Sequence, residues 1–398
     1  MGFTSVLLPQ LRQSMNVKLD ENQESWIASI VGMSLIVGVL IVPSVMARFG
    51  RRTANAISNM ILGVTWLALA FGTTYRYILF IRFLQGLSIG MTSIIAPIII
   101  GEYATPKYRG VFLTTIAMSF SLGVLILHSL SLYFNWQRIC FIFAVTSLLD
   151  CVIIMLSPES PSFLASKGRY EECKKAFHWL RYPDEDAELN ELIKSNMRDA
   201  KIVNHTCNNA QYFRDKFNEL LIMVKKREFY KPVVLMCHLH IINQWSASNL
   251  IGAYATDMFS IIIGSEVNIL HVLVSNDLIK LFSNFMAIIV IKRVRRRVML
   301  LTTISLNIAS LLLTAGHVYA KTHGVTTFDY PIVGTILVYF HVFTLAVGNL
   351  PLPNIICGEI FALEYRAISC MVTLLFYCVN MIINMKIALL LFATIGLH

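Results

Sequence analysis

Charged residues are scarce in this sequence. Lys, Arg, Asp and Glu make up 14% of the 398 residues, whereas a soluble globular chain carries about 25%. Hydrophobic residues account for 56%, and apolar stretches long enough to cross a bilayer recur along the chain. The shortage of charge excludes an ordinary soluble domain and favours a chain that crosses a membrane many times.

Metal-binding, disulfide and catalytic spacings are also missing. The eight cysteines lie mostly in or beside apolar stretches without paired C-x-x-C spacing, so we interpret them as small buried hydrophobic residues. His238 and His240 lie two residues apart and point to different sides of a helix, so they cannot easily share one ion. No nucleophile–base pattern is present, and we expect no enzymatic activity, no metal and no cofactor.

Among the few charged residues, basic ones outnumber acidic ones: the chain has 33 Lys and Arg and 23 Asp and Glu. A net charge of +10 is typical of nucleic-acid binding. Here, however, the basic residues cluster at the ends of apolar runs, where they orient spans in a bilayer. We therefore expect a lipid bilayer as partner and no nucleic acid.

The apolar runs divide the chain into two groups of spans. Ten full spans are predicted near residues 26–46, 54–73, 78–101, 111–133, 137–156, 232–260, 268–291, 298–319, 332–357 and 367–393. A short apolar piece at 2–13 is interpreted as the outer end of a further span. We expect an N-terminal transmembrane bundle at 1–156, a cytoplasmic helical linker at 157–231 and a C-terminal transmembrane bundle at 232–398.

Lys and Arg also predict the orientation of these spans. The connections at 47–53, 102–110, 292–297 and 358–366 contain eleven of them, and the opposite connections contain five. The excess of positive charge places the first set in the cytoplasm. The polar stretch at 157–231 falls on the same side, and Ser160-Pro161 is typical of a helix start there.

One half of the chain repeats features of the other. Glu102 precedes Arg109 by seven residues, and Glu359 precedes Arg366 by the same distance, 257 residues later. Basic clusters lie upstream of each pair, at 47–52 and 292–297. Self-similarity at a long period indicates an internally duplicated fold.

Seven ordered stretches carry a resemblance to a known family. They are LDENQESWIASI (19–30), RFGRR (48–52), the segment from RFLQGLSIGM to GEYATPKYRG (82–110), PESPSFL (158–164), NQWSASNLIGAY (243–254), GNLPLPNIICGEIF (348–361) and 380–386. The chain thereby resembles the sugar porters of the major facilitator superfamily, and among them the insect facilitated trehalose and glucose transporters. The resemblance implies an all-α, polytopic fold of two six-helix halves, incomplete at helices 1 and 12, with substrate bound between the halves.

The resemblance also implies a network of charges at the cytoplasmic helix ends. Carboxylates and guanidinium groups there form bidentate pairs, which would hold the inner ends of the two halves together while the site opens outward. The implied members are Arg48, Glu102, Arg109, Glu159, Glu359 and Arg366. The alternative is that these charges only set topology and anchor helices at the interface.

A substrate site is implied by amides within the spans, because amides both donate to and accept from sugar hydroxyls. The matching positions are Gln244, Asn249, Asn243, Asn380 and Asn384. Gly348, Pro351 and Pro353 retain part of a helix break, where the backbone can open toward a cavity. The alternative is that these amides join helices to one another.

The sequence departs from the family pattern at several motif positions. Non-matching residues stand at Ala47, Met118, Ser162, Asn243, Ala247, Lys280, Lys292, Arg295 and Asn354. Lys280 replaces an expected amide and is counted among the substrate-site candidates. Asp277 lies three residues before it on the same helical face, so we expect either a neutralising Asp277–Lys280 pair or a cation that faces the cavity.

These observations predict facilitative transport of a trehalose- or glucose-class sugar by alternating access, and the plasma membrane is the expected location. The alternative is a sugar sensor or degenerate pseudo-transporter that retains only the scaffold. A channel is disfavoured, because the chain has no ring of repeated charged or carbonyl-lining sequence.

Overall fold

The computed structural model describes residues 2–13, 19–181, 186–203, 225–264, 267–323, 331–361 and 366–395. Every regular element in these ranges is helical, and eight of the helices are long and apolar enough to cross a membrane. Helices satisfy their own backbone hydrogen bonds, which is the requirement for a span in lipid. The predicted all-α, polytopic fold is confirmed.

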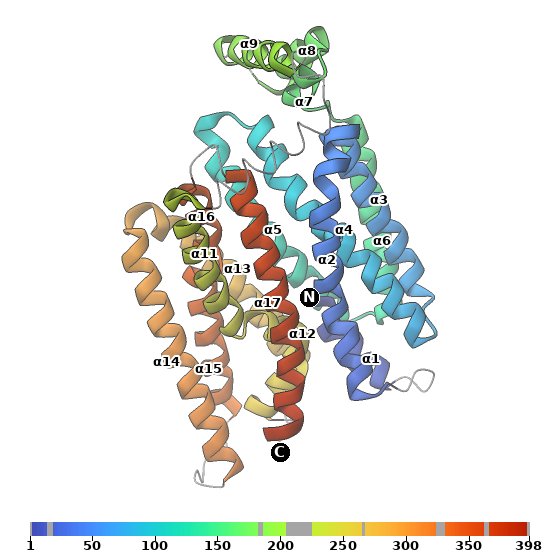
Figure 1. The fold of residues 1–398 in the computed structure, drawn as a ribbon. Coiled ribbons are helices and arrows are strands. Elements are labelled where there is room, and N and C mark those ends of the chain that lie inside the picture. The colour runs from blue at the N-terminus through green and yellow to red at the C-terminus, as the bar shows by residue number, and fades with distance from the viewer. Residues whose placement is uncertain are drawn as a thin grey trace.

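The N-terminal part of the molecule, drawn in blue to green in Figure 1, contains six described helices. They are α1 (Gly2–Gln13), α2 (Glu21–Phe49), α3 (Arg51–Ala70), α4 (Tyr75–Tyr103), α5 (Pro106–Ser131) and α6 (Trp136–Leu156). The most extensive packing joins α2 to α4 and α3 to α6. α5 has 26 residues, which is long enough to cross a bilayer.

Three short helices follow and lie together at one end of the molecule (Figure 1). They are α7 (Pro161–Ser166), α8 (Tyr170–Leu180) and α9 (Asp186–Val203), called the linker helices below. The predicted helix start is confirmed, since the Ser160 hydroxyl accepts a hydrogen bond from the Phe163 amide and Pro161 is the first helical residue. A small core of Leu164, Cys173 and Phe177 holds these helices together.

The C-terminal part contains the remaining helices. They are α11 (Arg227–Trp245), α12 (Ser248–Ile263), α13 (Ile269–Arg293), α14 (Arg296–Thr322), α15 (Pro331–Thr344), the π-helical turn η2 (Leu345–Asn349), α16 (Pro351–Ile360) and α17 (Arg366–Ile395). The span predicted at 232–260 is divided between α11 and α12, and the one predicted at 332–357 is divided between α15, η2 and α16. Both divisions fall at predicted polar or proline-rich motifs.

The two parts meet along three pairs of helices. These are α2 with α17, α5 with α13, and α1 with α12. The largest buried cluster includes Leu7 and Ile27 from the first part and Tyr254 and Met385 from the second. Because α1 lies at the end opposite the linker helices (Figure 1), we refer to that end as the outer end.

Small residues allow α2 and α4 to approach closely. A Cβ atom at Gly86 would lie 2.6 Å from the Val31 carbonyl oxygen, and one at Gly90 would press against Leu35 in the same way. Lipid supplies no hydrophobic driving force between helices, so such close contacts are a main source of helix association in membranes.

A sharp corner at Gly50 joins α2 to α3. Gly50 has φ 92° and ψ 172°, a backbone conformation that only glycine adopts readily. A Cβ atom there would also collide with the Glu159 carboxylate. That carboxylate accepts hydrogen bonds from the backbone amides of Arg51 (2.9 Å) and Arg52 (3.0 Å), so it caps the first turn of α3.

We predict that Gly50→Ala destabilises the protein by about 1–3 kcal/mol, from backbone strain together with displacement of Glu159. Thermal unfolding in detergent, followed by intrinsic fluorescence, measures the effect. Gly168→Ala is the matched control, because Gly168 also has a positive φ (74°) but a Cβ atom there has nothing within 4 Å. A loss as large for Gly168→Ala would contradict the contribution assigned to Glu159.

Candidate functional site

The break between α11 and α12 brings several predicted polar residues together. Ala247 at this break has φ 61° and lies in the left-handed region. The hydroxyls of Ser246 and Ser248 donate to the carbonyl oxygens of Ile242 (2.5 Å) and Asn243 (3.1 Å). The Ile242 carbonyl also accepts the Ser246 backbone amide, whereas the Ser248 hydroxyl serves the Asn243 carbonyl at the break, as a break within lipid requires.

Gln244 lies at the end of α11 and is fully buried. Its Oε1 accepts a hydrogen bond from Asn249 Nδ2, which also donates to the Tyr377 hydroxyl at 3.3 Å. The Gln244 Nε2 group has no hydrogen-bond partner among the described residues. Two of the predicted amides are therefore in contact, and one of them retains a buried, unused donor.

Tyr377 is a member of this cluster that the sequence analysis missed. It lies on α17, three residues before Asn380 and seven before Asn384, so the three share one helical face. Asn380 Nδ2 donates to the Phe376 carbonyl of its own helix (3.1 Å). Asn384 is buried, and its Oδ1 has no hydrogen-bond partner in the described part of the chain.

Asn243 has a connecting role in this structure. Its Nδ2 donates to the Asn349 carbonyl oxygen at 2.7 Å, and Asn349 Nδ2 donates to the Ser246 hydroxyl at 2.5 Å. These bonds tie the end of α11 to the π-helical turn η2. Pro351 begins α16 immediately after that turn, and Gly348 packs against Thr303 of α14.

Lys280 lies half-buried on α13, and of the two expected alternatives a direct Asp277–Lys280 ion pair is not recorded among the described residues. Asp277 Oδ2 lies 2.5 Å from Nδ1 of His128 on α5, and the structure records no ion pair of Lys280 among the described residues. Spacing along a helix predicts a shared face, but it does not predict which neighbouring helix supplies a closer partner. Asn276, next to Asp277, is buried with an Oδ1 that has no described hydrogen-bond partner.

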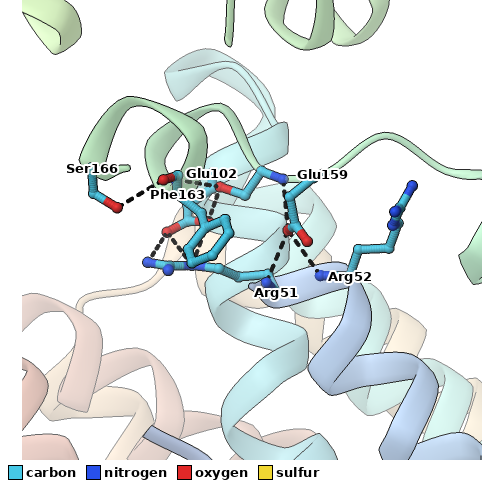
Figure 2. Close-up of polar contacts among 7 residues, drawn as sticks. Arg51, Arg52, Glu102, Glu159, Phe163 and Ser166 are labelled. Carbon is cyan, nitrogen blue, oxygen red and sulfur yellow. Dashed lines mark hydrogen bonds and ion pairs between the residues drawn. The ribbon is translucent and has the colours of Figure 1, made fainter. Parts of the chain in front are cut away.

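At the helix ends beside the linker helices, Glu102 pairs with Arg51 (Figure 2). Arg51 Nη2 and Nε donate to the carboxylate at 3.0 and 3.2 Å, and the Ser160 hydroxyl donates to its other oxygen. The Arg51 guanidinium also lies over the ring of Phe163. The sequence analysis identified Glu102 as a member of the charge network. It did not identify Arg51 as the partner of Glu102.

The remaining predicted members of this network have other positions. Glu159 caps α3, as described above, and Arg48 lies over the ring of Phe49. The side chains of Arg109, Glu359 and Arg366 lie outside the described part of the structure. The described network therefore connects α3, α4 and the start of the linker within the N-terminal part, and the predicted latch between the two parts stays a prediction.

Arg181 is a further residue that the sequence analysis missed. This buried side chain at the end of α8 donates to the Ala104 carbonyl oxygen (2.9 Å) just beyond α4, and pairs with Glu188 of α9 at 2.5 Å. It thereby fixes the linker helices to the C-terminal end of α4. A cation at the C-terminal end of a helix is also favoured by the helix dipole.

The outer end has its own ion pairs. Arg12 of α1 pairs with Glu24 of α2 at 2.5 Å and with Asp257 of α12 at 2.9 Å. The first contact lies within the N-terminal part, and the second joins it to the C-terminal part. No repeated motif marks these three residues, so the sequence offered no signal for them.

Comparison with known proteins identifies the type of molecule. A family model described as "Sugar (and other) transporter" matches residues 1–396. The chain is 25% identical to the facilitated trehalose transporter Tret1-2 homolog of Drosophila sechellia, across 92% of this chain and 73% of that protein. It is also 25% identical to the facilitated trehalose transporter Tret1 of Culex quinquefasciatus, across 100% of this chain and 75% of that protein.

Solved structures show the same fold. The major facilitator superfamily proton:xylose symporter XylE bound to 6-bromo-6-deoxy-D-glucose superposes with a TM-score of 0.75 and 17% identity, covering 98% of this chain and 87% of that one. The inward-open conformation of XylE from E. coli gives a TM-score of 0.72 and 15% identity, covering 98% and 86%. The predicted resemblance in fold and family is confirmed.

We predict that Ala247→Gly stabilises the protein by up to about 1 kcal/mol. The left-handed conformation costs an L-residue roughly 1–2 kcal/mol, and the greater flexibility of glycine in the unfolded chain offsets part of the gain. Thermal unfolding in detergent measures the change. The control is Ala117→Gly, at an exposed helical position of α5, which should lower stability by about 1 kcal/mol. A loss of stability in both variants would contradict the prediction.

Proposed function

The chain belongs to the sugar transporter family, and on this premise we propose that it carries a neutral sugar of the trehalose or glucose class across a membrane. Transport is facilitative and proceeds by alternating access, with the site exposed to one side at a time. The names of the insect relatives support trehalose, and the sugar held by the XylE structure supports a glucose-type ring. The plasma membrane is the proposed location.

The buried Gln244 amide is the observation that carries this proposal. An amide without its hydrogen bonds is costly in a membrane interior, yet Gln244 Nε2 has no described partner. Asn276 and Asn384 likewise retain a buried oxygen without a described partner. The Gln244 Nε2 donor on α11 and the Oδ1 acceptors of Asn276 on α13 and Asn384 on α17 suit sugar hydroxyls, because a hydroxyl both donates and accepts hydrogen bonds.

The ion pairs at the two ends suggest how access alternates. Arg12 and Asp257 join the two parts at the outer end, so opening toward that side requires this exposed pair to separate. Exposed pairs contribute only about 0–1 kcal/mol, a barrier that thermal motion overcomes readily. The Glu102–Arg51 cluster lies within one part and can move as a rigid unit during this change.

We predict that labelled trehalose or glucose enters proteoliposomes that contain the protein, and that Gln244→Met lowers uptake per molecule by about tenfold. Methionine keeps the volume of the side chain but removes the amide, and one hydrogen bond is worth about 0.5–1.5 kcal/mol. Asn59→Leu is the control, because the Asn59 amide donates only to Asn55 of its own helix. Absence of uptake by the parent protein would instead favour the sensor or pseudo-transporter alternative.

We predict that Lys280→Gln raises neutral-sugar uptake per molecule severalfold. The substitution supplies an amide where the family pattern has one and removes a charge that costs roughly 2.5–3.5 kcal/mol within a span. Expression should not fall, because Asp277 keeps His128 as its partner. The control variant Lys280→Met removes the charge without adding an amide, so it separates the two effects. If Lys280→Gln takes up sugar no faster per molecule than the parent protein, Lys280 does not face the cavity.

A further inference from the structure

Two cysteines without a recognisable spacing in the sequence come together in the C-terminal part. Cys357 lies on α16 and Cys370 on α17, and their Sγ atoms are 3.3 Å apart. Both are present as thiols. They are separated by 13 residues along the chain, so the fold rather than a local motif creates this contact.

The pair belongs to an apolar cluster at the end of the C-terminal part nearer the linker helices (Figure 1). Met236 and Leu239 of α11 and Phe361 form the buried core of this cluster, and both cysteines pack against it. Packing of neighbouring helices therefore holds the two thiols side by side. A disulfide bond is about 2.05 Å long, so a rotation of each side chain about its Cα–Cβ bond supplies the remaining approach.

Partial exposure distinguishes this pair from most of the other cysteines. Cys357 and Cys370 are partly exposed, whereas Cys140, Cys173 and Cys378 are buried. Oxidation of a cysteine depends on access to its sulfur, which partial exposure provides. Two further cysteines, on α6 and α11, are also partly exposed, but no sulfur–sulfur contact is recorded for either of them within the described ranges.

We propose that Cys357 and Cys370 form a redox-modification site, at which a low-molecular-weight disulfide converts the two thiols into a disulfide bond between α16 and α17. One cysteine, as its thiolate, attacks a sulfur of the small disulfide, which gives a mixed disulfide and one small thiolate. The other cysteine attacks the mixed disulfide, which forms the Cys357–Cys370 bond and releases the second small thiolate. The two cysteines are oxidised, the small disulfide is reduced to two thiols, and the two protons lost by the cysteines end on these thiols.

The expected compartment suits a reversible modification. The excess of basic residues predicts that this end of the molecule faces the cytoplasm. Glutathione keeps thiols reduced there, and cytoplasmic disulfides are usually transient and regulatory. The pair therefore rests as thiols and forms the bond when the glutathione pool becomes more oxidised.

The position of α16 gives the bond a consequence. The π-helical turn η2 and Pro351 separate α16 from α15, and π-turns and prolines are sites at which helices bend. By contrast, α17 runs as one helix of 30 residues, so a covalent bond to α17 restrains the bending of α16. The effect on transport rests on the proposed function: restraint of α16 slows the change between outward and inward access, and the oxidised protein carries sugar more slowly.

The first experiment measures the bond itself. The full-length protein in nanodiscs is equilibrated with mixtures of glutathione and glutathione disulfide, its remaining thiols are blocked with N-ethylmaleimide, and peptide mass spectrometry quantifies the Cys357–Cys370 cross-link. The oxidised fraction should rise from about one tenth to about nine tenths over a roughly eightyfold increase in the ratio of glutathione disulfide to the square of glutathione, as for one two-electron couple. Dithiothreitol should remove the cross-link.

Three variants decide the assignment. Cys357→Ser and Cys370→Ser should each abolish the cross-link and leave a mixed disulfide with glutathione on the remaining cysteine. Cys151→Ser is the matched control, because Cys151 is partly exposed but lies on α6, and this variant should keep the titration of the parent. A parent protein that yields only mixed disulfides, or that pairs either cysteine with Cys237, would overturn the proposal.

Hydrogen–deuterium exchange tests the restraint of α16 without any sugar. The backbone amides from η2 through α16 should exchange more slowly in the cross-linked parent than in the reduced parent, because local opening of this segment is hindered. The same treatment should leave the exchange of Cys370→Ser unchanged. Equal exchange in the cross-linked and reduced parent would contradict the restraint.

Uptake assays separate this proposal from the proposed function. Uptake by the parent should fall in proportion to the cross-linked fraction and recover with dithiothreitol, whereas Cys370→Ser should keep the rate of the reduced parent. If no sugar enters in either redox state while the cross-link forms and slows exchange, the transport proposal fails and the redox site stands. If uptake is normal and no cross-link forms, the redox site fails and the transport proposal stands. Complete cross-linking with unchanged uptake would overturn the effect on transport.

Discussion

The absence of water from the bilayer interior is the constraint on which this structure depends. Each backbone group within the membrane must find a partner in the chain, so the described chain is helical and every interruption is repaired locally. The Ser248 hydroxyl bonds the Asn243 carbonyl at the break between α11 and α12. A π-helical turn and Pro351 carry the chain across the break before α16, and Glu159 caps the corner at Gly50.

The same constraint makes buried polar side chains informative. Most of those described are hydrogen-bonded, often to the carbonyl three or four residues earlier in their own helix, as Thr303 is. The exceptions stand out because an unused amide is costly in lipid. Gln244, Asn276 and Asn384 are three of these exceptions, and all three belong to helices of the C-terminal part.

Charges have different roles at the two ends of the molecule. At the end that carries the linker helices, Arg51, Glu102 and Arg181 fix these helices to α3 and α4. At the outer end, Arg12 with Asp257, and deeper His128 with Asp277, join one part to the other. Rocking of two rigid halves requires firm contacts within each half and separable contacts between them, and this distribution of ion pairs provides both.

The sequence by itself determined the helical class, the helix break at Gly348 to Pro353 and the polar motif from Asn243 to Asn249, because hydropathy, glycine, proline and amides act locally, whereas the break between α11 and α12 emerged only in the structure. It also identified Glu102 and Lys280 as unusual positions. Only the tertiary structure decided the partners: Arg51 for Glu102, Tyr377 for Asn249, Asp257 for Arg12, and His128 instead of Lys280 for Asp277. Spacing along one helix predicts which residues share a face, but the rotation and depth of the neighbouring helix decide which side chain lies within bonding distance.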